Sequence, residues 1–166
     1  MTDPDAPPDP SDRSARAIAA AESLGLDHQV TRHGRVRSLE EAARARGVEP
    51  RAVVKTIVVR LSDDDYRFVL VPGDREIAWP KLRTLLAVNR ISMPSAEVAL
   101  AVTGYVRGTI TPLGSTRAWP VIADATLSGP VSLGGGAHGV ALTVDAEELV
   151  TALGAVVADV TEPGGA

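Results

Sequence analysis

Residues 52–71 read AVVKTIVVRLSDDDYRFVLV. Residues 52–61 and 66–71 are rich in β-branched and aliphatic side chains, and the polar segment between them contains three consecutive aspartates. Apolar runs of this kind are typical of buried β-strands, and a short polar segment between two of them is typical of a turn. We therefore expect a β-hairpin here, with the rest of the fold packed around it.

Five segments outside the hairpin have the spacing or the end signals of a helix. The clearest follows Ser38, which forms a capping box with Glu41, and it ends at Gly47. The expected helices are residues 12–24, 38–46, 79–86, 95–102 and 146–153.

Short apolar segments separated by glycine and proline account for most of the remaining chain. We expect strands at residues 28–32, 105–110, 120–123, 131–133, 140–144 and 155–160. Short strands between turn signals, with helices at the periphery, predict an α+β domain built around a curved or barrel-like β-sheet.

The chain has 166 residues, a length that fits one domain. Four prolines interrupt residues 1–10, which we expect to be a disordered tail before a single domain at 11–166. The absence of cysteine excludes disulfides and thiolate metal sites. The start of the chain is acidic rather than basic, and no apolar run approaches the ~20 residues that span a bilayer. A cytoplasmic location without a membrane partner is therefore expected.

The net charge of −4 argues against a dedicated nucleic-acid-binding protein and gives no reason to expect DNA as a partner. Arginine supplies nearly all of the positive charge, because lysine occurs only at Lys55 and Lys81. Local basic patches remain compatible with this composition.

Lys55 stands inside the apolar run 52–61. In an extended strand it shares a face with Val53, Ile57 and Val59, where an ammonium is costly unless it is paired or reaches a cavity. Two interpretations stay open: a lysine at a strand edge that reaches water, or a lysine in a cleft that binds phosphate or polarises a carbonyl.

Two glycine-containing segments are candidate loops of a site. Residues 103–114 read TGYVRGTITPLG, and backbone amides in such a segment can form an oxyanion hole, although strand, turn and strand is the simpler interpretation. Residues 134–139 read GGGAHG, which lacks the signatures of nucleotide-binding loops and is compatible with a flexible hairpin loop.

No metal site and no serine triad is expected. His28, His33 and His138 lack the spacing of zinc motifs, and the chain contains no GxSxG elbow. Each histidine is interpreted as a surface or cleft-rim residue, and no cofactor is expected.

Five blocks in order resemble the YbaK/prolyl-tRNA-synthetase-associated editing family over about residues 12–160. The blocks are His33 with SLEEAA at 38–43, VKTIV at 54–58, VPGDR at 71–75 with Lys81 and Leu82, TGYVRGTITPLG at 103–114, and Asp124 with Gly134 and Gly135. The resemblance implies a mostly antiparallel, barrel-like central sheet with surrounding helices.

The resemblance also implies an activity: hydrolysis of the ester that joins a wrong amino acid to the 3′ end of a tRNA, which protects translation fidelity. No metal or cofactor is implied. The expected substrate is proline tRNA carrying Cys, Ala or another small amino acid, and a prolyl-tRNA synthetase is a possible partner. Catalysis would rest on Lys55 and on amides near Gly104. The expected substrate-binding residues include His33, Thr56, Thr103, Gly108, Gly134 and Gly135, with Asp124 in a supporting role.

The chain departs from the family pattern at three positions of the implied amino-acid pocket. Thr31 replaces a tyrosine, Leu133 a serine and Ala141 an aspartate. These changes remove polar groups or reduce side-chain size, so we expect Ala, or another small or aliphatic amino acid, to be preferred over Cys.

Two other functions remain possible from the sequence. The first is a catalytically inactive tRNA- or synthetase-binding module of the same fold, and the second is a small-ligand-binding domain of another family. The negative net charge also leaves open how the chain would bind tRNA. Either a synthetase binds the tRNA for it, or basic side chains cluster on one face, namely Arg32, Arg35, Arg37, Arg75 and Lys81.

Overall fold

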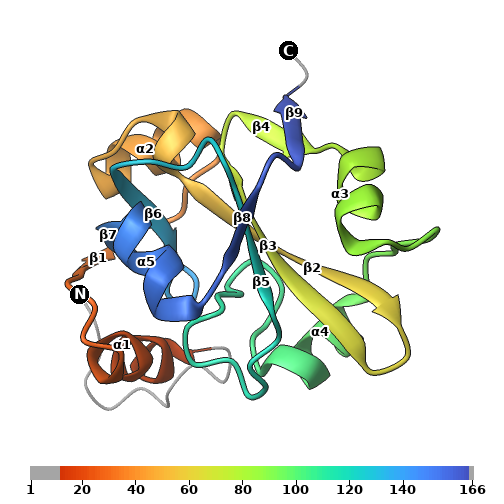
Figure 1. Ribbon diagram of the computed structural model, residues 1–166. Helices are drawn as coiled ribbons and strands as arrows, with labels where there is room; N and C mark the ends of the chain where they lie inside the picture. Colours follow the sequence, from red (N-terminus) through yellow and green to blue (C-terminus); the bar gives the residue numbers. More distant parts are fainter. Residues whose placement is uncertain (1–11, 165–166) are drawn as a thin grey trace.

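The computed structural model describes residues 12–164 (Figure 1). The tail predicted at residues 1–10 lies outside the described residues, as do residue 11 and residues 165–166 of the predicted domain. Within the described part of the chain, no helix is long and apolar enough to cross a membrane.

The hairpin predicted at 52–71 is confirmed as strands β2 (Val54–Ser62) and β3 (Asp65–Pro72). They pair antiparallel, with Lys55 opposite Val71 and Val58 opposite Phe68. β3 continues the sheet by parallel pairing with β5 (Val121–Asp124), and β5 pairs in parallel with β8 (Val156–Ala158). The central sheet therefore has the order β2-β3-β5-β8 and is mixed rather than purely antiparallel.

Two smaller antiparallel sheets complete the β structure of residues 12–164. One has the order β1-β7-β6, with β1 at Gln29–Arg32, β7 at Val140–Asp145 and β6 at Pro130–Gly134. The other pairs β4 (Arg75–Ile77) with β9 (Thr161–Pro163). The predicted α+β class is confirmed, but the described strands form three separate sheets instead of a closed barrel.

The five predicted helices are confirmed, with small shifts at their ends. They are α1 (Ser14–Ser23), α2 (Leu39–Arg46), α3 (Trp79–Leu86), α4 (Ala96–Thr103) and α5 (Ala146–Leu153), and a 3₁₀ turn occupies Pro50–Ala52. Ser38 caps α2 by accepting the amide of Glu41 at 3.0 Å, whereas the Glu41 carboxylate accepts the amide of Arg37. α3 lies to one side of the central sheet, and α1, α2 and α5 gather around the β1-β7-β6 sheet on the other side (Figure 1).

Two apolar clusters bury opposite faces of the β2–β3 hairpin. Phe68 and Leu70 pack in the larger cluster, which reaches the β1-β7-β6 sheet through Leu133 and Leu142. Val69 and Val71 pack in a smaller cluster with Leu82 of α3. Successive residues of β3 are thus buried alternately in the larger and the smaller cluster. Both faces of the strand are covered, which explains why its sequence is apolar throughout.

The strand predicted at residues 105–110 is wrong, because this segment is a loop after α4. Gly104 and Gly108 have φ values of +79° and +91°, which belong to the left-handed region and end regular structure. Tyr105 is fully buried, and its hydroxyl donates to the carbonyl of Leu113 at 2.6 Å. The loop is thus anchored by its own side chain rather than by a neighbouring strand.

Candidate active site

The candidate site lies along the outer edge of β2, where the central sheet has no continuous neighbour. Two isolated bridges bound this stretch of edge: Val53 with Ser132 at one end, and Arg60 with Ser92 at the other. Arg60 exchanges backbone hydrogen bonds with Ser92 at 2.7 and 3.0 Å, so its peptide groups point away from β3.

The peptide groups of Thr56 and Val58 point in the same direction as those of Arg60. Residues of a strand alternate between the two edges, and the β2–β3 register runs without a shift from Val54 to Arg60. On β3, the amide of Phe68, which lies opposite Val58, donates to Pro120 and not to β2. The N–H and C=O groups of Thr56 and Val58 are therefore available to a ligand at this edge.

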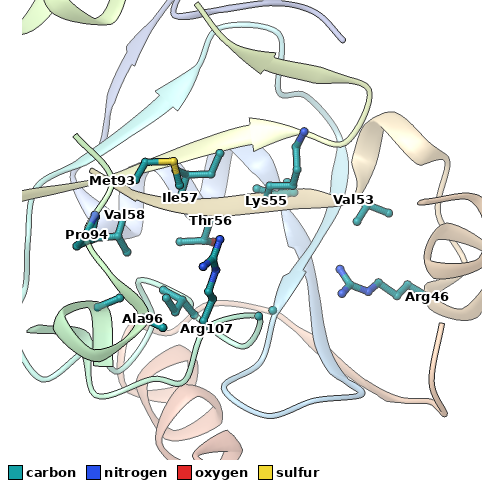
Figure 2. Close-up of a pocket in the computed structure, with 15 residues that line it drawn as sticks. Arg46, Val53, Lys55, Thr56, Ile57, Val58, Met93, Pro94, Ala96 and Arg107 are labelled. Atoms are coloured by element: carbon teal, nitrogen blue, oxygen red, sulfur yellow. The ribbon is translucent and has the colours of Figure 1, made fainter. Parts of the chain in front are cut away.

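A cavity of about 610 Å³ opens at this edge, and we call it the β2 cavity. Its walls come from β2, from α4 with the preceding Met93 and Pro94, and from the loop that carries Arg107 and Gly108 (Figure 2). A second cavity of about 540 Å³, the histidine cavity, is lined by His33, His138 and their neighbours. The two cavities adjoin, because Arg46, Gly108 and Gly134 line both.

Both cavities are lined by positive and neutral side chains. The β2 cavity has Arg46, Lys55 and Arg107, the histidine cavity adds Arg35, and no aspartate or glutamate of the described chain lines either one. The charge of the site is therefore positive, whereas the net charge of the whole chain is −4. A cleft lined by one sign of charge attracts ligands of the opposite sign, so the site favours an anion.

Of the five basic side chains that the sequence left open as a tRNA-binding cluster, Arg35 alone lines one of these two cavities. Arg35 lines the histidine cavity, but Arg32 and Arg37 line neither cavity. Arg75 donates to Thr161, and Lys81 pairs with Asp159 at 3.0 Å. The cations that do line the site include Arg46 and Arg107, and neither was predicted from the sequence. Arg46 lies outside the five blocks, and Arg107 lies inside the block 103–114, where the glycines and Thr103 drew the expectation.

Lys55 lines the β2 cavity, as expected, but its ammonium faces β4. Its Nζ donates to the carbonyl of Arg75 at 2.5 Å. Figure 2 shows this ammonium and the Arg107 guanidinium on opposite sides of β2. Partial burial lowers the pKa of Lys55 below its ordinary value, and the nearby carboxylates of Glu76 and Asp74 act in the opposite direction. Lys55 itself remains exposed to solvent, between the buried Val54 and the partly buried Thr56.

Gly108 and Gly134 are the two glycines of the predicted site that line the cavities. A side chain at Gly108 would meet the ring of His138 at 3.4 Å, and one at Gly134 would meet the carbonyl of Ile110 at 3.2 Å. Within residues 12–164, the amide of Gly108 donates to no backbone carbonyl. Gly108 is an exposed residue at the junction of the two cavities, so its amide is a candidate hydrogen-bond donor to a ligand oxygen.

The structure places Gly104 and Thr103 away from both cavities. Gly104 is the left-handed C-cap of α4, and a Cβ there would lie 2.6 Å from the Arg16 guanidinium. Thr103 is buried, and its hydroxyl donates to the carbonyl of Ala99 within the same helix. These two residues shape the end of α4, while Gly108 is the loop glycine that reaches the site.

Of the other expected site residues, His33 lines the histidine cavity and Thr56 the β2 cavity. The three positions that depart from the family pattern line neither cavity. Leu133 and Ala141 are fully buried, and Thr31 pairs with Ala141 across β1 and β7. Gly135 is also buried, and its amide donates to the carbonyl of Val140.

Asp124 lies at the end of β5, buried and away from both cavities. Its carboxylate accepts hydrogen bonds from Thr126 and from the amide of Val160. Burial by itself raises the pKa of Asp124, but the hydrogen bonds from Thr126, Thr161 and Val160 outweigh it and hold the pKa below its ordinary value. Residues 12–164 contain no group of three or more His, Cys, Asp or Glu able to hold a metal ion.

Residues 33–152 match the family model described as the aminoacyl-tRNA editing domain. The chain belongs to this family. A solved structure described as a candidate trans-editing enzyme for prolyl tRNA synthetase shares this editing-domain fold, with a TM-score of 0.82, 26% identity, and coverage of 94% of this chain and 99% of that one.

The editing domain is also similar to part of two curated proline–tRNA ligases. It is 37% identical over 79 residues to the ligase of Caldicellulosiruptor saccharolyticus, which covers 48% of this chain and 14% of the ligase. It is 31% identical over 117 residues to that of Citrifermentans bemidjiense, covering 70% of this chain and 20% of the ligase. The chain thus spans a fifth or less of the length of these relatives.

Proposed function

We propose that this editing domain hydrolyses the ester bond of a mischarged aminoacyl-tRNA, acting in trans to a prolyl-tRNA synthetase. The observation that carries the proposal is a cavity of this family's fold that is lined by Lys55 and two arginines and by no carboxylate. The 3′ end of a tRNA is an anion that suits such a cavity, and a relative of the same fold is described as a candidate trans-editing enzyme for prolyl tRNA synthetase.

In the proposed reaction, water attacks the ester carbonyl carbon, the bond from that carbon to the ribose oxygen breaks, and the ribose hydroxyl leaves with a proton. The negative charge that develops on the carbonyl oxygen needs a donor. In this proposal the amide of Gly108, an exposed residue that lines both cavities, supplies one. Loss of a single donor of this kind typically costs about 10²–10³ in rate.

Lys55 acts in this scheme by turning its ammonium from the Arg75 carbonyl toward the ester. The lysine stem is flexible, and within the described part of the chain a single hydrogen bond, to the Arg75 carbonyl, holds the ammonium in its present place. The free ribose hydroxyl of the substrate helps to activate the water, so the domain needs no nucleophile of its own.

The test is deacylation of proline tRNA charged with Cys, Ala, Ser or Pro, by wild type and by Lys55→Ala. Lys81→Ala is the matched control, because Lys81 is the other lysine of the chain and pairs with Asp159 on the α3 side. We expect rapid loss of one small amino acid, a fall of at least ~10²-fold in Lys55→Ala, and no change in Lys81→Ala.

Two results would contradict the proposal. One is equal activity in the two lysine variants, and the other is no hydrolysis of any ester by wild type. In the second case, tRNA affinity at low salt decides whether the chain is a catalytically inactive tRNA-binding module, which is the alternative function.

A further inference from the structure

Buried polar atoms without a partner gather around the two cavities. Five such side-chain atoms occur within residues 12–164, and four of them belong to His33, Arg46, Thr56 and Ser132. His33, Arg46 and Thr56 line the cavities, and the carbonyl of Ser132 accepts from Arg46. Buried polar groups in proteins are nearly always hydrogen-bonded, so a concentration of unpaired ones marks a place where a ligand supplies the missing partners.

Among these residues, Arg46 is the one that carries a full charge, so leaving it without a counter-ion costs the most folding free energy. It is the last residue of α2 and half-buried, its Nε has no partner, and its Nη1 makes a long bond of 3.4 Å to the Ser132 carbonyl. Within the described residues, Arg46 forms no ion pair with a carboxylate. Burial of this guanidinium lowers its pKa below the ordinary value. A buried charge without a partner destabilises a fold, so the counter-ion is expected to arrive with the ligand.

The donors near Arg46 come from three different elements. Arg46 projects from the end of α2, Thr56 from β2 and Arg107 from the loop after α4. Arg46 and Arg107 line the same cavity. Figure 2 shows the Arg46 side chain extending from the end of α2 toward this cavity, and the Arg107 guanidinium directed toward β2 with the Thr56 side chain beside it. A planar carboxylate is satisfied by one arginine fork, whereas a tetrahedral phosphate presents oxygens in several directions and suits donors that converge from several walls.

We propose that Arg46 is the phosphate receptor of this site, binding a phosphate of the ligand's terminal nucleotide between itself and Arg107. The inference rests on the proposed function for the source of that phosphate, the 3′-terminal nucleotide of a tRNA. It assigns phosphate binding to Arg46 and leaves Lys55, on the other side of β2, to the ester.

The experiment measures binding of adenosine 5′-monophosphate, adenosine and inorganic phosphate to the wild-type chain and to Arg46→Met by calorimetry. We expect wild type to bind the monophosphate at least ~10-fold more tightly than adenosine, and Arg46→Met to lose ~10- to 100-fold of the monophosphate affinity with adenosine unchanged. Arg46→Lys, which keeps the charge without the planar fork, should lose less. Arg44→Met is the control, because Arg44 is exposed on the same helix.

A second readout separates this role from a structural one. Because Arg46→Met removes an unpaired half-buried charge, its Tm without ligand should equal or exceed that of wild type. Equal wild-type affinity for the monophosphate and adenosine would overturn the inference. So would an Arg46→Met variant that melts earlier and loses both ligands alike.

These measurements do not depend on catalysis. If no ester is hydrolysed but the monophosphate preference still requires Arg46, the proposed deacylase function fails and the phosphate receptor stands. Inorganic phosphate that competes with the monophosphate in wild type but not in Arg46→Met locates the phosphate group at this arginine.

Discussion

The Nζ of Lys55 donates to the carbonyl oxygen of Arg75 at 2.5 Å, on the opposite side of β2 from Arg107. The two residues that precede and follow Arg75 in sequence are Asp74 and Glu76, whose carboxylates favour the charged form of Lys55. The chemistry proposed for Lys55 therefore depends on a lysine whose ammonium is hydrogen-bonded to β4, and this placement can be tested directly.

The first prediction concerns the titration of Lys55. Partial burial lowers its pKa below the ordinary 10.5, and Glu76 partly restores it, so Glu76→Gln should lower the pKa further. With only two lysines in the chain, NMR of ¹³C-labelled lysine gives two side-chain signals, and Lys81→Arg assigns them. The alkaline limit of deacylation should move to lower pH with the pKa. An unchanged pKa in Glu76→Gln, or the same shift in Glu147→Gln on the distant α5, would contradict this prediction.

The second prediction separates two glycines of the loop after α4. Gly104→Ala should destabilise the fold by at least the ~1–2 kcal/mol of a left-handed non-glycine residue, because its Cβ would also lie 2.6 Å from Arg16 and Thr116. Gly108→Ala has the same backbone cost but meets only the His138 ring, at 3.4 Å. Gly108 lines both cavities and Gly104 lines neither, so the rate of deacylation should fall more in Gly108→Ala. The free energy of unfolding in urea should fall more in Gly104→Ala. The opposite result for the two variants would indicate that Gly104, and not Gly108, belongs to the active site.

The third prediction concerns Asp124 as a structural carboxylate. Asp124→Asn weakens hydrogen bonds that tie β5 to Thr126 and to the segment before β9, and should cost about 1–3 kcal/mol at pH 7. Because the pKa of Asp124 is below its ordinary 3.8 in the folded state, this stability is present above pH 3.8 and is lost as the pH falls through the folded pKa. Urea unfolding at pH 7 and at pH 3 should show the gap between wild type and variant narrowing in acid. A gap that widens instead would refute the assignment.

The fourth prediction concerns Leu133, one of the positions expected from the sequence to select the amino acid. Leu133 is fully buried in the larger apolar cluster, so Leu133→Ala should cost about 2–5 kcal/mol. The ratio of Ala- to Cys-ester hydrolysis should stay as in wild type, because this side chain lines neither cavity. A changed ratio at unchanged stability would place Leu133 in the amino-acid pocket after all.

Local patterns in the sequence were sufficient for the hairpin and for the five helices, since each has its own apolar period, cap or glycine stop. They failed where pairing is decided at long range. β4 and β9 are strands of three residues each, and Arg75 of one lies opposite Pro163 of the other, so neither carries a recognisable run of its own. The strand predicted at residues 105–110 was wrong for the opposite reason. The segment has the apolar and β-branched residues of a strand, but Gly104 and Gly108 have positive φ and prevent a regular strand.

The candidate site shows the same division between local and long-range information. Lys55 was predictable because a lone ammonium in an apolar run is unusual. Arg46 was not, because an arginine in the last turn of a helix is ordinary there and complements the helix dipole. Only the fold brings Arg46 beside Ser132, 86 residues away, and into the same cavity lining as Arg107.

The open stretch of β2 has one more consequence, for association between molecules. An exposed strand edge is a template on which another chain can add a strand and begin to aggregate. Here the Val53–Ser132 and Arg60–Ser92 bridges close both ends, and the outward peptide groups between them belong to a segment no longer than Val54–Val59. An extended peptide that paired along this edge would run into one bridge or the other. The two bridges that bound the open stretch thus also protect the sheet against edge-to-edge pairing.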